Sequence, residues 1–104
     1  MKKIKIFQLN NPLRKLRGSS VVLQAQVIEH KTGIDRRGRH YFILCVKDNS
    51  GHYKIRNNIY FYNALLMEGL RCFEEGHLIS ISGIIKEDFG QKYLVFKVLK
   101  IQRV

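Results

Sequence analysis

The second half of the chain changes from a strand pattern to a helical pattern and back again. Apolar and polar residues alternate over residues 53–62, as in a strand with one buried face. The next stretch follows a helical spacing, with Asn63 as the expected N-cap. Its apolar side chains are Leu65, Leu66, Leu70 and Phe73. A single short helix must therefore connect an early group of strands to a later one.

The predicted helix ends at Glu74-Glu75-Gly76, where the glycine is expected to supply a left-handed backbone conformation. Two further strands are predicted at residues 77–86 and 92–102, joined by a hairpin loop at residues 87–91. Gly83 lies inside the first of them, at a position where we expect the strand to bend sharply.

Two strand patterns precede the helix and residues 53–62. The first has Val21, Leu23, Ala25 and Val27 on one face. Residues 31–40 follow it with two glycines and four basic residues, so we expect a loop there. The next strand, over residues 41–47, ends in the turn sequence Asp48-Asn49-Ser50-Gly51, which favours a tight hairpin.

The register of the strand over residues 53–62 decides which side chains reach solvent. In a regular strand Tyr53, Ile55, Ile59 and Phe61 point to the core, and Lys54, Arg56, Asn58, Tyr60 and Tyr62 point outward. A bulge at Asn57-Asn58 is the alternative, and it would exchange the two tyrosines with Ile59 and Phe61.

The charge of the chain predicts an anionic partner. The sequence has 104 residues, the length of one domain, and its 19 Lys and Arg against 8 Asp and Glu give a net charge of +11. With 45% hydrophobic residues it can form a small core, so the charge belongs to a folded domain. We expect nucleic acid as the partner. An anionic membrane surface, or no particular polyanion, is the alternative, although no long basic amphipathic helix is present.

Residues 1–20 carry six of the cations and no acid, and they are expected to form a basic arm or an extra edge strand. A solvated leader is the alternative. The start of the chain resembles a signal peptide in its charge, but no long apolar run follows. The two cysteines, Cys45 and Cys72, lack a metal-type spacing and suggest buried thiols in a reducing compartment, so we expect a cytoplasmic protein without a disulfide.

The order strand, strand, strand, helix, strand, strand resembles the OB-fold family. The resemblance covers about residues 20–104. It rests on the turn at 48–51, Glu74-Glu75-Gly76 before the fourth strand, Gly83 within it, and Phe89-Gly90 in the last hairpin. It implies a mainly β protein, a five-stranded Greek-key barrel with a short helix between the third and fourth strands. It also implies a ligand groove across the second and third strands, flanked by the first and last hairpin loops.

The residues around that groove have the composition of a single-strand binding surface. Cations neutralise phosphates, and exposed rings stack on unpaired bases, which a duplex hides. The expected nucleic-acid-binding residues are Lys31, Arg36, Arg37 and Arg39 in the first loop, Tyr41, Lys47, Lys54, Arg56, Tyr60 and Tyr62 on the strands, and Phe89 and Lys92 by the last loop.

Catalytic chemistry is not expected. The acids and four histidines are scattered, and no metal, phosphate-loop or Cys-x-x-Cys motif is present, so no metal or other cofactor is predicted. The sequence predicts a non-catalytic protein that binds single-stranded DNA with weak sequence preference in replication, recombination or repair. An RNA-binding module for tRNA or rRNA and a protein-interaction domain are the alternatives. Protein partners in a replication or repair complex and homo-oligomers stay open.

Overall fold

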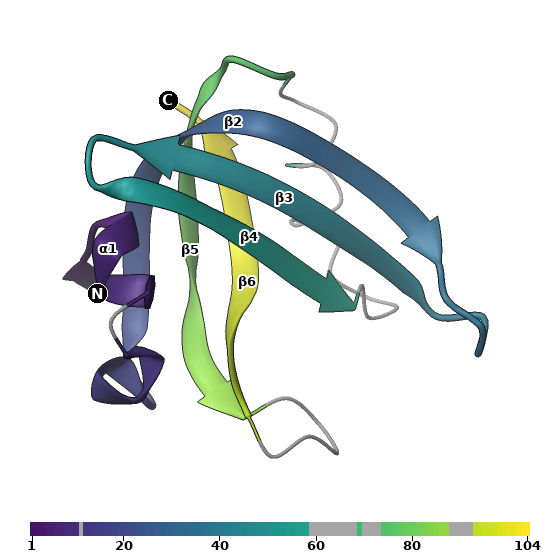
Figure 1. Ribbon diagram of the computed structural model, residues 1–104, viewed down its shortest axis with the longest axis horizontal. Coiled ribbons are helices and arrows are strands. Elements are labelled where there is room, and N and C mark those ends of the chain that lie inside the picture. The colour runs from purple at the N-terminus through teal and green to yellow at the C-terminus, as the bar shows by residue number, and fades with distance from the viewer. Residues whose placement is uncertain (11, 59–68, 70–73, 88–92) are drawn as a thin grey trace.

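The computed structural model describes residues 1–10, 12–58, 69, 74–87 and 93–104. Its elements in chain order are β1 (Lys2–Lys3), helix α1 (Ile6–Asn10), the 3-10 helix η1 (Leu13–Leu16), β2 (Ser20–Ile34), β3 (His40–Asp48), β4 (Gly51–Asn58), β5 (Leu78–Glu87) and β6 (Leu94–Arg103). The strands form one sheet in the order β4-β3-β2-β5-β6, and β1 pairs with β2 in parallel (Figure 1). The other strand pairs are antiparallel.

Strand β2 is long because it belongs to both halves of the sheet. Its first part, from Ser20, pairs with β5, and its last part, to Ile34, pairs with β3. The pairing register with β3 shifts between Val27 and Glu29, which leaves Ile28 as the extra residue of a bulge. Figure 1 shows β2 curving over the molecule, so that β3 and β4 lie across β5 and β6. One strand thereby turns a flat sheet into a rolled one.

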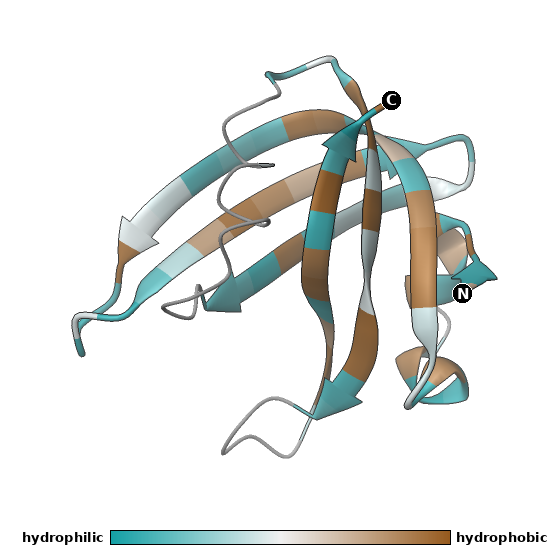
Figure 2. Ribbon diagram, turned by 180° about the vertical axis from the view of Figure 1, so that it is seen from behind, coloured by the Kyte–Doolittle hydropathy of each residue, from teal (hydrophilic) through white to brown (hydrophobic). Residues whose placement is uncertain are grey.

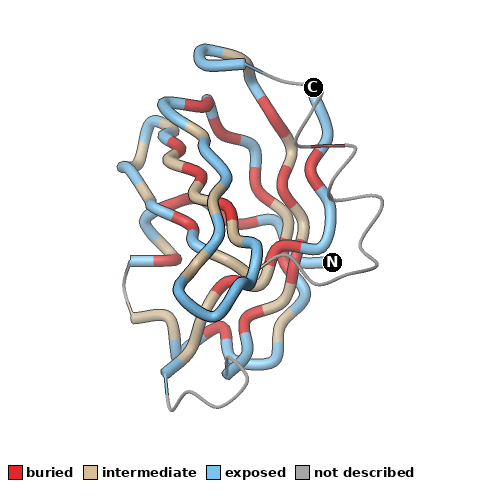
Figure 3. Tube along the Cα trace, turned by 90° about the vertical axis from the view of Figure 1, so that its right-hand side faces the viewer, coloured by how far each residue is buried: buried red, intermediate tan, exposed pale blue. Residues whose placement is uncertain are grey.

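The predicted alternation of the strands is confirmed where the structure describes it. In β2 the residues Val21, Leu23, Ala25 and Val27 are buried, and in β3 the buried residues are Phe42, Leu44 and Val46. Figure 3 shows buried and more exposed residues following one another along the strands, and Figure 2 shows the same alternation of apolar and polar residues along β5 and β6. The core therefore lies inside the rolled sheet.

The strand pairing corrects one sequence prediction and decides between two alternatives for another. The loop expected over residues 31–40 is shorter, because residues 31–34 continue β2 and pair with residues 40–43 of β3. This part of the strand was missed in the sequence because Lys31, Thr32 and Gly33 are polar or small. The bulge considered at Asn57-Asn58 is not there, because β4 pairs with β3 without a shift from Gly51 to Asn58. The pairing confirms Lys54 and Arg56 as outward-facing residues.

Two glycines shape β5, the strand that was predicted from the sequence as the fourth. Gly76 has a φ of 89°, the left-handed conformation expected before β5. Gly83 lies at a register shift in the pairing of β5 with β6, and a side chain there would collide with the backbone carbonyl of Lys97. The predicted helix over residues 63–75 falls mostly outside the described residues. Gly69, which is described, is buried and leaves no room for a side chain against Ile101 of β6.

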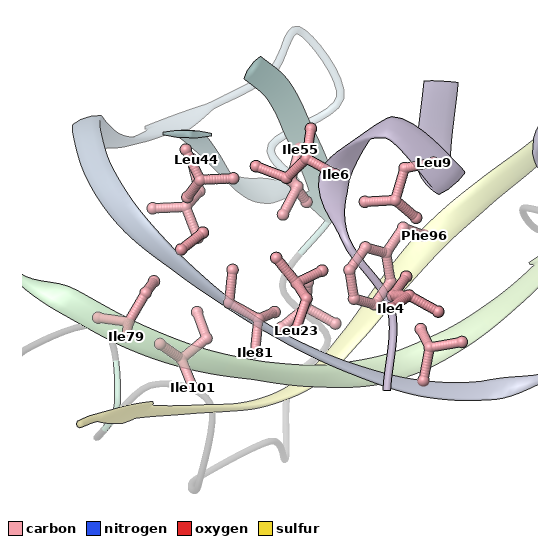
Figure 4. Packing of buried hydrophobic residues seen from close by; sticks show 14 of the residues in the cluster. Ile4, Ile6, Leu9, Leu23, Leu44, Ile55, Ile79, Ile81, Phe96 and Ile101 are labelled. Atoms are coloured by element: carbon pink, nitrogen blue, oxygen red, sulfur yellow. The ribbon is translucent and has the colours of Figure 1, made fainter. Parts of the chain in front are cut away.

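Residues before β2 contribute to the same core. Ile4, Ile6, Leu9 and Leu16 are all buried. Figure 4 shows Ile6 and Leu9 among the core side chains that include Ile55 and Phe96. The N-terminal segment therefore covers one opening of the rolled sheet. No helix among the described residues has the length and apolarity needed to cross a membrane.

The sheet stays open between β4 and β6. No backbone ladder joins these two strands in the described part of the chain, and the side chain of Asn57 connects them. Its Nδ2 donates to the carbonyl of Phe96 at 3.0 Å, and its Oδ1 accepts from the N–H of Val98 at 2.7 Å. A single amide side chain thus bridges two strand edges that a closed barrel would join by backbone bonds.

Candidate nucleic-acid interface

The outer face of β2, β3 and β4 carries cations in successive cross-strand rows. Residues opposite one another in the pairing lie on the same face. The rows are Lys31–Ile43–Arg56, then Glu29–Cys45–Lys54, then Gln26–Lys47–His52. The exposed cations on this face are Lys31, Lys47, Lys54 and Arg56. Glu29 is the acid within these rows. The pairing of three strands therefore gathers cations that are up to 25 residues apart in the sequence.

Tyr41 lies between Gly33 and Arg56 on this face. Gly33 pairs with Tyr41 across β2 and β3, and a β-carbon at residue 33 would come within 2.6 Å of the Tyr41 hydroxyl. The Arg56 guanidinium carbon lies 4.6 Å from the centre of the Tyr41 ring, a cation–π distance. The glycine therefore makes room for the tyrosine, and the tyrosine supports the arginine.

The hairpin between β2 and β3 is organised by Asp35. Its carboxylate accepts from the N–H groups of Arg37 and Arg39, both at 2.9 Å, and from Arg39 Nε at 2.8 Å. The backbone bond from Arg39 is the main cause that lowers the Asp35 pKa; desolvation opposes it, and the Arg39 side chain and Arg37 add to it. Arg36 and Arg37 are exposed at the tip. The turn therefore holds Arg39 in place and leaves two guanidinium groups to solvent.

A cleft of about 310 Å³ follows the open edge between β4 and β6. One wall is β4, with Tyr53, Lys54 and Arg56, and the other is the first part of β6, preceded by Tyr93. Asp35 and Arg39 from the hairpin also line it. Figure 1 shows the β2–β3 hairpin extending beyond the end of β4. The cleft thus lies where the strand face, a basic hairpin and an aromatic side chain come together.

Two tyrosines give the cleft its aromatic character. Tyr93 is 57% exposed, so its ring is open to a ligand. Tyr53 packs against the core, and this burial raises the pKa of its hydroxyl. The Tyr53 hydroxyl therefore stays protonated over the physiological range and can donate a hydrogen bond to an anion.

The structure brings many of the predicted site residues together. Arg39, Lys54 and Arg56 line the cleft, and Lys31, Tyr41 and Lys47 lie on the adjoining strand face. Arg36 and Arg37 lie at the hairpin tip beside the cleft-lining residues Asp35 and Arg39. Tyr60, Tyr62, Phe89 and Lys92 lie outside the described residues.

Four residues of the site were missed in the sequence: Gly33, Tyr53, Asn57 and Tyr93. Tyr93 precedes Leu94, so the alternation of the last strand already placed its ring away from the core. Tyr53 was assigned to the core alone. The roles of Gly33 and Asn57 depend on contacts with other strands, which no local pattern reveals. Cys45, expected to be a buried thiol, is partly exposed on the outer strand face.

The side chains of this surface are suited to binding an anion. Its charged groups are mainly ammonium and guanidinium groups, which attract phosphates. Among the described residues no group of three or more His, Cys, Asp or Glu side chains is placed to hold a metal ion. The site therefore fits an extended anion with flat groups attached.

No protein-family model matches the sequence, and no curated protein matches it. Solved structures do match it in fold. One is a protein of Klebsiella pneumoniae described as a "putative nucleic acid-binding lipoprotein", which is 17% identical with a TM-score of 0.67, over 96% of this chain and 92% of that one. A second is from the structure of yeast Stn1 and Ten1, 14% identical with a TM-score of 0.69, over 100% of this chain and 63% of that one.

A third match is the second OB-fold domain of replication protein A from Methanococcus maripaludis. It is 21% identical with a TM-score of 0.52, and the match covers 98% of this chain and 94% of that domain. At these identities the likeness concerns the fold, and it agrees with the strand order described above. The chain has an OB fold.

Proposed function

We propose that this protein is a non-catalytic binder of single-stranded nucleic acid, with DNA as the preferred ligand and a role in replication, recombination or repair. The observation that carries the proposal is the continuity between the cationic strand face and the cleft. Lys54 and Arg56 belong to both. A strand of nucleic acid lying along β4 would have its phosphates near these cations and its bases within reach of Tyr93.

A single strand fits this surface better than a duplex. Tyr93 is exposed beside the cleft, and Arg56 presents the flat side of a guanidinium that Tyr41 supports from below. Both groups gain most from unpaired bases, whose faces a duplex buries. A duplex would use the cations and leave the flat groups without a partner.

The names of the structural neighbours support the proposal at the level of analogy. One is described as nucleic acid-binding, and another is a domain of replication protein A. Because a fold hosts many functions, the argument depends on the residues of this chain and not on the neighbours.

A titration at two or more salt concentrations tests the proposal. Tyrosine fluorescence should be quenched saturably by a 15-nucleotide oligo-dT, and log K should fall linearly with log salt. The matched RNA oligomer and the matched duplex are the competitors, and both should compete less well than the DNA strand. No binding of any oligomer at low salt contradicts the whole proposal, and stronger competition by RNA contradicts the preference for DNA.

Protection of Cys45 tests the location of the site. In a Cys72→Ser background Cys45 is the sole thiol, and it lies opposite Lys54 on the outer strand face. A saturating oligo-dT should slow alkylation of Cys45 at least several-fold, while a free nucleotide should not. Unchanged alkylation at saturation places the ligand elsewhere on the molecule.

A further inference from the structure

The edge of β2 is open for a short distance between β1 and β3. Strand β1 pairs with Val21 and Val22, and β3 begins to pair at Gln26, so residues 23–25 have no strand partner on this edge among the described residues. The carbonyl of Val22 accepts the Ile4 N–H on this edge at 3.0 Å. Because backbone groups alternate in direction along a strand, the N–H and C=O of Gln24 face the same edge.

A depression of about 470 Å³ occupies this gap. Ile4 and Leu23, both buried in the core, lie at its base. Lys3, Lys5, Gln24 and Ser80 contribute its polar lining. The depression therefore combines two ammonium groups with backbone groups that lack a strand partner.

Lys5 is held at the gap by contacts with the β3–β4 turn and with its own segment. Lys5 Nζ donates to Asn49 Oδ1 at 3.1 Å, and its backbone N–H donates to Gln8 Oε1 at 2.9 Å. The next residue, Ile6, donates its N–H to Asp48 Oδ2 at 2.9 Å. These bonds fix the segment against the β3–β4 turn, so a ligand would meet a Lys5 that is already positioned.

The acid beside the gap is engaged by the protein itself. Asp48 lines the depression, but its Oδ2 accepts from Ile6, and its Oδ1 accepts from the N–H and the hydroxyl of Ser50. Two cations, Lys3 and Lys5, line the depression against this one acid. The electrostatic balance at the gap therefore favours an anion.

The gap continues the basic strand face. Arg56, Lys54 and His52 are alternate residues of β4 and span about 13 Å along the strand. His52 lies in one cross-strand row with Lys47 of β3 and Gln26 of β2. Gln24 is the next outward residue of β2 toward the gap. A strand of nucleic acid that leaves the cleft in this direction therefore meets Lys47 and then the gap.

We propose that the gap between β1 and β3 is a second phosphate-binding site for the same nucleic-acid strand. Lys3 and Lys5 supply the charge, and the Gln24 N–H supplies a fixed donor. The site lies outside the groove that the fold family implies, and it depends on the function proposed above. It makes the protein recognise length, because a short oligomer fills the cleft and a longer one also reaches the gap.

Oligomers of two lengths test this site. Fluorescence anisotropy would compare a 6-nucleotide and a 20-nucleotide oligo-dT from 50 to 200 mM salt. Replacing both lysines, Lys3→Gln with Lys5→Gln, removes about two phosphate contacts and should lower the salt slope for the long oligomer by about 1.4. The slope for the short oligomer should not change. The matched control, Lys15→Gln with Lys100→Gln, removes the same charge elsewhere and should leave both slopes as they are.

A second variant tests the gap without changing a lysine. Ser80→Asp places a carboxylate in the depression and should weaken the long oligomer several-fold and the short one hardly at all. Equal losses for both lengths, or no loss for the long oligomer in either variant, overturn the second site while the cleft still binds. If neither length binds the unmodified protein, the proposed function fails instead.

Discussion

At the scale of single residues, the support of Arg56 by Tyr41 is the feature with the clearest consequence for binding. Arg56→Lys keeps the charge and loses the flat guanidinium, which a base can stack on. We expect affinity for oligo-dT to fall about tenfold, a loss of about 1.4 kcal/mol, while the slope of log K against log salt stays unchanged. Titration of both proteins over the same salt series measures the two quantities separately.

Lys54→Gln is the complementary variant, because Lys54 lines the same cleft but serves as a point charge. It should lower the salt slope by about 0.7, the value for one phosphate of a single strand. If Arg56→Lys also lowers the slope, or costs no affinity, then the guanidinium acts through its charge alone and the stacking role is wrong.

At the scale of elements, the junction of β4 and β6 depends on Asn57. Asn57→Ala leaves the Phe96 carbonyl and the Val98 N–H without their partner, and each unsatisfied group costs about 1–3 kcal/mol. Because both groups lie at a partly solvated edge, we expect a total loss at the low end of their sum, about 2–3 kcal/mol in the free energy of unfolding. Urea denaturation measures the loss, and hydrogen exchange should show the Val98 amide losing protection before the amides paired between β5 and β6.

The neighbouring Asn58→Ala is the control for this junction. Asn58 is the next residue of β4 and pairs with Tyr41, and the side-chain bonds to Phe96 and Val98 come from Asn57. It should change stability by less than about 0.5 kcal/mol. Equal effects of the two substitutions would mean that Asn57 contributes no specific connection between the strands.

The elements also show what the sequence can predict. The alternation in Val21–Val27 and 41–47 was sufficient to place both strands and their buried faces, because each half-buried strand carries its own periodic signal. The end of β2 was missed because Lys31, Thr32 and Gly33 are polar or small, and this part of the strand is held by pairing with β3. The outward positions of Lys47, Lys54 and Arg56 were predictable from alternation in the same way. Gly33 and Asn57 were not, because their function arises from contacts between strands.

At the scale of the whole molecule, Asp48 ties the N-terminal segment to the rest of the fold. Burial acts to raise its pKa, but the hydrogen bonds from Ser50, Ile6 and Gly51 outweigh burial and hold the pKa below its ordinary value. A carboxyl group whose pKa is lowered by folding stabilises the fold above its unfolded pKa of about 4. That contribution disappears as the pH falls through the lower pKa of the folded state.

Asp48→Asn should therefore be destabilised at pH 7 and not at strongly acidic pH. The amide retains part of the hydrogen bonding, and solvent screening is appreciable, so we expect a loss of about 1 kcal/mol at neutral pH. The difference from the unmodified protein should begin to shrink below about pH 4, where the unfolded chain binds the proton, and should disappear as the pH falls through the lower pKa of Asp48 in the folded protein. Urea denaturation from pH 7 to pH 2.5 measures both curves, and repulsion within a chain of net charge +11 affects the two proteins alike.

Asp35→Asn is the control that separates the loss of the Asp48 hydrogen bonds from acid sensitivity in general. The pKa of Asp35 is also lowered, but its partners are Arg37 and Arg39 within one hairpin. Both substitutions should flatten the acid dependence, whereas Asp48→Asn alone should speed hydrogen exchange at the Ile6 amide, which donates to Asp48. Unchanged exchange at Ile6 would show that the segment is held by its buried side chains and not by Asp48.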